Sequence, residues 1–397
     1  MASALMWVVL ALSPAGASAQ HGDAGREAIA RYGCTSCHEV PGIAQDAETS
    51  CVGCHQQVVR RSRGMGAGPR VTHYLSAPDL ARVTHRLDRE YLVRFLMDPH
   101  DVRPRLEETM PRLPVTEEDA RAMVGYLERV APPRPRIESA PAPSASRLAA
   151  GEQAFRTSGC PACHSFGNYD PGFEMPADAL RALGDAPRHA PNLRFVRDRM
   201  DPDVALAWIR DPRRIDPATH LEPPDVTAGE ALAIRDFLYL GVPGAAAGVP
   251  DAPRASTLEP LDRPVRFAEV RRIFGRSCIH CHAHSDDGGT ATSLGYDPVA
   301  LDLSSYDGVL AGARRPDGTR VSLIDSADGE VPILLARLLR RHGEAPRDVV
   351  PPGGDTLIRA MRPQRDRDLP GMPLGLPPLP ERDLRVVATW IAQGAPR

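Results

Sequence analysis

All eight cysteines of this 397-residue chain belong to four copies of one five-residue pattern, Cys-x-x-Cys-His. The copies are Cys34-Thr-Ser-Cys37-His38, Cys51-Val-Gly-Cys54-His55, Cys160-Pro-Ala-Cys163-His164 and Cys278-Ile-His-Cys281-His282. Two thiols at this spacing can add to the vinyl groups of one porphyrin, and the adjoining histidine can ligate its iron. The sequence therefore predicts four covalently attached c-type haems, each with one proximal iron ligand. These ligands are His38, His55, His164 and His282.

Three other kinds of cysteine chemistry were weighed against haem attachment. Paired Cys-x-x-Cys motifs can hold structural zinc, eight cysteines in an exported chain can form four disulfides, and a single pair can act as a thioredoxin-like redox site. None of these requires a histidine directly after all four pairs, so the pattern favours haem.

The N-terminal residues predict export from the cytoplasm. The chain is apolar from Ala2 to Leu12 and then carries small residues up to Ala19, where Ala17-Ser-Ala19 has the Ala-x-Ala form of a cleavage site. We expect residues 1–19 to be a signal peptide, with an uncleaved anchor as the alternative. No other long apolar run follows, so we expect a soluble periplasmic or extracellular protein with no stable membrane span.

Composition adds two expectations about partners and core. A net charge of −3 implies that nucleic acid is not a partner. Aromatic residues make up 5% of the chain, a low share that is expected if haems supply much of the buried apolar surface.

Two Pro/Ala-rich stretches, 131–146 and 242–264, have the composition of linkers. They divide the mature chain into residues 20–130, which hold two of the motifs, and residues 147–241 and 265–397, which hold one each. The predicted fold is mainly α, with three helical domains in tandem.

The first two segments form a divergent repeat. Residues 24–34 match 150–160, Ala77-Pro-Asp-Leu80 matches Ala190-Pro-Asn-Leu193, and Arg86 matches Arg199. Each segment closes with a predicted helix that begins at an N-cap threonine, Thr116 or Thr227, with an acidic residue three positions later. The third segment also ends in a predicted helix, through Leu384 and Trp390.

This order of elements resembles the class I cytochrome c domain. The shared features are a helix before Cys-x-x-Cys-His, short helices and loops, a Met-Pro loop and a closing helix. The third segment is more similar to cytochrome domains of large secreted bacterial proteins. The resemblance implies that the first and last helices cross and that the Met-Pro loop supplies a thioether ligand to the iron.

Two methionines occupy this Met-Pro position. Met110 precedes Pro111 and the closing helix of the first segment, so it is the predicted distal ligand of the haem on Cys34 and Cys37. Met372 precedes Pro373 in the third segment and is predicted for the haem on Cys278 and Cys281, with Met361 as the weaker alternative. His342 is predicted to lie on a solvated, arginine-rich helix face.

The second segment has no methionine at this position. Its aligned residue is Leu221, which cannot bind iron, and His220 stands beside it. We therefore predict that His220 ligates the iron, and the alternative is a five-coordinate iron. The other possible ligands are His189, Met200 and Met175.

The second motif, at Cys51, is an insertion into the first cytochrome-like segment. Its predicted distal ligand is His73, and His85 and His100 are alternatives.

Four haems in one chain predict a relay that passes electrons between redox partner proteins, including other cytochromes or further copies of itself. Two alternatives remain. One is an electron-transfer subunit docked on a larger oxidoreductase, and the other is a peroxidase-like haem enzyme that uses an open iron in the second segment.

Overall fold

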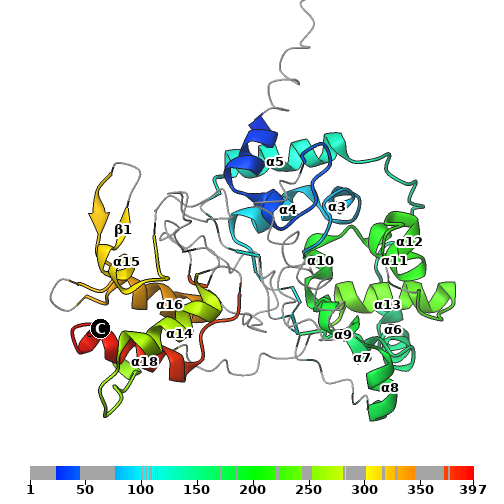
Figure 1. Cartoon of the computed structure of the whole chain (residues 1–397). Coiled ribbons are helices and arrows are strands. Elements are labelled where there is room, and N and C mark those ends of the chain that lie inside the picture. The colour runs from blue at the N-terminus through cyan, green and yellow to red at the C-terminus, as the bar shows by residue number, and fades with distance from the viewer. Residues whose placement is uncertain are drawn as a thin grey trace, which may run out of the picture.

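The chain is mainly α-helical, as the sequence predicts (Figure 1). The computed structural model describes residues 24–44, 77–243, 253–279, 282, 301–344 and 371–397. Within these ranges it leaves out 101, 104, 107–109, 112, 114, 168, 170–171, 173, 185, 220, 222, 315–317, 327–329 and 374–375. The predicted signal peptide, 1–19, lies outside the described residues. No helix among those described is long and apolar enough to cross a membrane.

The first segment begins with a helix over residues 24–31. Its further elements are η1 (Cys34–Ser36), α3 (Val83–Arg86), α4 (Arg89–Met97) and α5 (Glu117–Val130). Thr116 caps α5 as predicted, because its hydroxyl accepts the backbone N–H of Asp119 at 3.1 Å. The Asp119 carboxylate accepts from the Tyr32 hydroxyl at 2.9 Å and pairs with Arg31, so it ties α5 to the first helix.

The second segment consists of short helices between two longer ones. They are η2 (Ala145–Arg147), α6 (Leu148–Thr157), α7 (Cys160–Cys163), α8 (Ala177–Ala182), α9 (Ala186–His189), η3 (Leu193–Phe195), α10 (Val196–Arg199), α11 (Pro202–Arg210), α12 (Pro212–Ile215) and α13 (Ala228–Leu240). Thr227 and Glu230 form a complete capping box at the start of α13, as the sequence predicts.

In both segments a glycine lies where the first and last helices meet. A Cβ on Gly25 would lie 2.2 Å from the carbonyl oxygen of Ala122 in α5, and one on Gly151 would lie 2.0 Å from that of Ala233 in α13. Both distances are too short for any side chain. The helices therefore approach closely in two repeats because both carry glycine at the same position.

The third segment contains η4 (Ala255–Thr257), α14 (Phe267–Ser277), α15 (Tyr306–Ala311), β1 (Ala313–Arg314), β2 (Arg320–Val321), α16 (Ile333–Glu344) and α18 (Glu381–Ala392). The short strands pair antiparallel, with Ala313 opposite Val321. Counted back from the first cysteine, the position of Gly25 and Gly151 is occupied here by Glu269. Packing instead comes from large side chains, such as Phe267 against Trp390 with ring centroids 5.8 Å apart.

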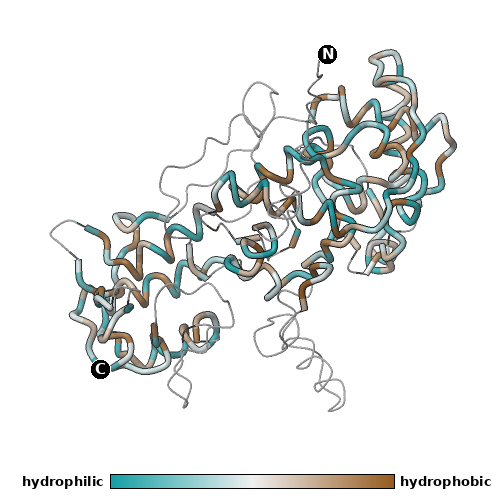
Figure 2. The backbone as a smooth tube through the Cα atoms, turned by 90° about the horizontal axis from the view of Figure 1, so that it is seen from above, coloured by the Kyte–Doolittle hydropathy of each residue, from teal (hydrophilic) through white to brown (hydrophobic). Residues whose placement is uncertain are grey.

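The described residues form three hydrophobic cores, one in each segment. In Figure 1 the helices of the third segment form a group of their own, beside the group formed by the first two segments. Hydrophobic and hydrophilic residues alternate along the helices in Figure 2, as expected of helices with one buried face. Leu258, within the predicted linker 242–264, is buried in the third core and so belongs structurally to that segment.

The first two segments contact each other through backbone and side chains. The backbone N–H of Asp88 donates to the carbonyl of Arg199 at 2.8 Å, and that of Asn192 donates to the carbonyl of Val102 at 2.8 Å. Leu87 packs against both cores. These contacts join the two segments into one packed unit.

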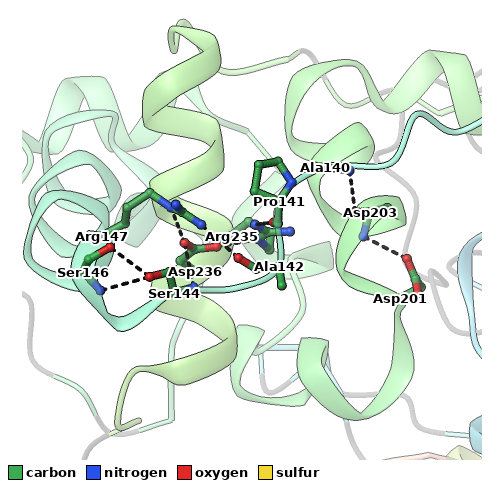
Figure 3. Close-up of polar contacts among 10 residues, drawn as sticks. All are labelled: Ala140, Pro141, Ala142, Ser144, Ser146, Arg147, Asp201, Asp203, Arg235 and Asp236. Carbon is green, nitrogen blue, oxygen red and sulfur yellow. Dashed lines mark hydrogen bonds and ion pairs between the residues drawn. The ribbon is translucent and has the colours of Figure 1, made fainter.

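The predicted linker 131–146 has no helix or strand over residues 132–144, and it is held against the second segment (Figure 3). Asp236 is fully buried in α13 and accepts from Arg235 at 2.6 Å, Arg147 at 2.5 Å and the backbone N–H of Ser144 at 3.1 Å. Arg235 also donates to the carbonyl of Pro141 at 2.6 Å. One buried ion pair therefore fixes the end of the linker.

We expect the substitution Asp236→Ala to lower the free energy of unfolding by about 3 kcal/mol, because it leaves the buried Arg235 guanidinium without its carboxylate. Urea unfolding of the full chain, followed by far-UV circular dichroism, measures this. Trypsin should also cleave faster within residues 131–147. Asp225→Ala, at an exposed position, is the control and should change stability by less than ~0.5 kcal/mol. Equal effects of the two substitutions would contradict the role given to Asp236.

Candidate haem sites

Each described motif begins with a helical turn that brings the first cysteine and the histidine together. The backbone N–H of His38 donates to the carbonyl of Cys34 at 2.9 Å, and that of His164 donates to Cys160 at 2.9 Å. His282 makes the same bond to Cys278 at 3.0 Å. Before the motifs at Cys34 and Cys160, a glycine in the left-handed region ends the preceding helix, with φ of 63° at Gly33 and 72° at Gly159. Glycine adopts this conformation without steric cost, so it allows the sharp reversal before the first cysteine.

Two of the predicted proximal histidines make the same hydrogen bond. The Nδ1 of His38 lies 2.8 Å from the carbonyl oxygen of Pro78, and the Nδ1 of His164 lies 2.9 Å from that of Pro191. A carbonyl can only accept, so Nδ1 must carry the hydrogen and Nε2 must carry the lone pair. Burial lowers the pKa of both imidazoles and so favours the neutral form, which is the form that binds metal.

The proline carbonyls are positioned by the turn that follows each of them. Leu80 donates its N–H to the carbonyl of Glu39 at 3.0 Å, and Leu193 donates to Ser165 at 2.8 Å, so each turn is tied to the residue after its histidine. Asn192 is buried, and its side-chain oxygen accepts the N–H groups of Gly167 and Arg194.

The third segment contains a turn of the same kind that the sequence analysis missed. Leu303 donates its N–H to the carbonyl of His282 at 2.8 Å, and the Asp302 carboxylate accepts the N–H of Ser304 at 2.8 Å. In the first segment Asp79 accepts the N–H of Ala81 in the same way at 2.8 Å. The dipeptide Asp-Leu was the available signal, but two residues are too few to align with confidence across an otherwise different segment.

A cavity of about 210 Å³ opens beside His164 in the second segment. One buried water needs only ~10–15 Å³, so the space suits a much larger group. Its walls are mostly apolar and include Cys160, Phe155, Leu193, Met200, Trp208, Leu221, Ile234 and Leu238. An apolar pocket with an attachment cysteine and a neutral imidazole fits a covalently held porphyrin.

The thiols do not have the character of a redox-active pair. Burial raises the pKa of Cys34 to about 11 and that of Cys160 to about 11, so both are protonated at neutral pH. A thioredoxin-like cysteine needs a lowered pKa. Among the described residues, Cys34, Cys160 and Cys163 are free thiols. Within the described ranges no three His, Cys, Asp or Glu side chains cluster as a metal site would require.

The predicted methionine ligands both lie in loops that precede a closing helix. Met110 is half-buried before α5. Met372 is half-buried before α18 and packs against the core that contains Cys278, so the third segment brings these two predicted site residues into one cluster.

Helix α16 holds the loop of Met372 in place, a role that the sequence analysis did not anticipate. The carbonyl of Arg337 accepts the N–H of Met372 at 3.0 Å, Arg341 donates to the carbonyl of Leu376 at 2.6 Å, and the Nε2 of His342 lies 2.8 Å from the carbonyl of Leu379. The prediction of a solvated face here was wrong, because Arg341 is buried and His342 is half-buried against this loop.

Several predicted site residues lie outside the described residues. They are Cys51, Cys54, His55, His73, His220, Cys281 and Met361. For the second motif, two alternatives to His73 are described. His85 is buried with its Nε2 2.9 Å from the carbonyl of Pro132, and the His100 ring packs 4.8 Å from that of Phe195. Both take part in packing or hydrogen bonding within the unit formed by the first two segments.

In the second segment Leu221 lines the cavity beside His164, where the repeat places it. Met200, one of the alternative ligands, is buried and lines the same cavity. The described geometry therefore brings one side chain that cannot bind iron and one thioether to the cavity of His164.

Comparisons of the chain with family models, with curated protein sequences and with solved structures found no match.

Proposed function

We propose that this chain is an exported tetrahaem c-type cytochrome that relays electrons between redox partners in the periplasm or outside the cell. The observation that carries the proposal is the matched hydrogen bond from His38 to Pro78 and from His164 to Pro191. It fixes the ring orientation and tautomer that an iron ligand needs, directly beside an attachment motif, in two separate segments.

The residues of the chain would hold, orient and bury the cofactor. The cysteine pairs would hold each porphyrin covalently, and the histidines would ligate the iron from one side. A bound haem supplies reversible one-electron chemistry, and the protein sets its potential through the distal ligand and burial. A thioether from Met110 or Met372 stabilises ferrous iron more than an imidazole does, so the centres would differ in potential.

A second function, small-ligand chemistry at an open haem, is favoured by one observation. Leu221 lines the cavity of His164 at the position that the repeat assigns to a distal ligand. If neither His220 nor Met200 ligates this iron, the site is open to peroxide or a similar small molecule.

The four motifs predict covalent loading. The intact mass of the mature protein should exceed that of the apoprotein by four haems, and acidified acetone should extract none. The double substitution Cys160→Ser with Cys163→Ser should remove one haem and leave three. Bound zinc, or four disulfides in place of haem, would end the proposal.

Met110 and Met372 are predicted sixth ligands. The ferric protein should show a thioether-to-iron absorption band that falls by about half in Met110→Ala and disappears in the double variant with Met372→Ala. Met97→Leu is the control, because Met97 packs against the first core and should leave the band unchanged. A band that does not respond to Met110→Ala would remove that residue from the ligand set.

The second segment gives a prediction about ligand binding. If His220 ligates the haem of His164, the reduced His220→Ala variant should bind one more equivalent of CO per chain than the wild type. His189→Ala should bind no additional CO. Rapid CO binding by this haem in the wild type, with no change in His220→Ala, would favour the open site. The measurement is a CO titration of the full chain followed by difference absorption.

A further inference from the structure

The cavity of the second segment is lined in part by the first segment. Arg86, the last residue of α3, lines the cavity together with His164, Cys160 and Trp208. Its guanidinium lies 5.1 Å from the centroid of the Trp208 ring. The first segment therefore contributes a cation to the candidate haem pocket of its neighbour.

The cavity holds more positive charge than its described surroundings balance. Arg199, the counterpart of Arg86 in the repeat, lines it as well. The Nε of Arg86 is buried and has no hydrogen-bond partner among the described residues. Burial, and then the charges of Arg199 and Arg103, lower the pKa of Arg86 to about 10 against the opposing effect of Asp216. Arg86 therefore remains protonated at neutral pH, and because it is half-buried with an enclosed Nε, an anion beside it would be stabilising.

We propose that Arg86 is a positioning residue for the haem of the second segment, where its guanidinium and that of Arg199 bind the propionate carboxylates of the porphyrin attached to Cys160 and Cys163. The inference rests on the proposed function. Guanidinium groups bind carboxylates through paired hydrogen bonds, and the buried Nε of Arg86 is a donor of this kind.

The proposal makes one haem dependent on two segments. Arg86 reaches the cavity because the first segment is docked on the second, through the bonds from Asp88 to Arg199 and from Asn192 to Val102. Arg105 adds a third contact, donating to the carbonyl of Ala162, between Cys160 and Cys163 of the second segment, at 3.2 Å. The potential of this haem would thus be set partly by its neighbouring segment.

The test is a spectroelectrochemical titration of the full chain carrying Arg86→Gln. A nearby positive charge favours ferrous over ferric haem, so its loss should lower the midpoint potential of one haem and leave the other three in place. The expected shift is about tenfold in the reduction equilibrium, or ~59 mV for one electron. Below neutral pH, the potential of that haem should rise more steeply as pH falls than in the wild type, because its propionates now protonate more readily.

Two further variants control for folding and for nonspecific charge. Arg86→Lys keeps the charge and should retain most of the wild-type potential. Arg82→Gln, one turn earlier on the same segment, removes a charge outside the cavity lining and should shift none of the four potentials.

The proposal is overturned if a fully loaded Arg86→Gln protein shows no selective shift, if Arg82→Gln shifts the same haem, or if Arg86→Lys shifts it as far as Arg86→Gln does. A wild-type potential that varies with phosphate concentration would assign the arginines to a solution anion instead. Haem content, measured by mass on each sample, separates these outcomes from failure of the proposed function, in which no haem is attached at all.

Discussion

The hydrogen bond between a histidine Nδ1 and a proline carbonyl fixes the orientation of the histidine on which the candidate site of each of the first two segments depends. His38 and His164 can present Nε2 in one direction only because Pro78 and Pro191 fix the opposite nitrogen. The proline turns are in turn fixed by backbone bonds from Leu80 and Leu193 to the residues that follow each histidine. The motif and the turn therefore hold each other, although about 27 to 40 residues separate them in the chain.

The three segments reach similar arrangements by different packing. The first two rely on Gly25 and Gly151, which let the flanking helices approach until backbone meets backbone. The third has Glu269 at that position and fills the space between α14 and α18 with large apolar side chains. It also uses α16 to hold the loop of Met372, through Arg337, Arg341 and His342. The third segment thus replaces close helix contact with a supporting helix.

Local patterns were predictable from the sequence, and contacts between distant elements were not. Thr116 and Thr227 mark the starts of α5 and α13 because capping depends on neighbouring residues alone. Leu221 could be placed at the cavity because the repeat supplied a register. His342 was wrongly expected on a solvated face, since its hydrogen bond is to a loop more than thirty residues away. Arg86 reaches the cavity beside His164 only because the two segments are docked, and no periodicity in the sequence encodes that contact.

The contact between Arg105 and Ala162 also bears on the order in which the chain can be completed. Ala162 lies between Cys160 and Cys163, and its carbonyl is covered by a side chain from the preceding segment. An enzyme that joins a porphyrin to these two thiols needs access to the residues that carry them. Once the two segments have docked, the Arg105 side chain of the first segment lies against these residues and restricts that access. If a porphyrin is attached as proposed, attachment at the second segment would be easiest while the segments are still apart, and the docked interface would close over the site after maturation.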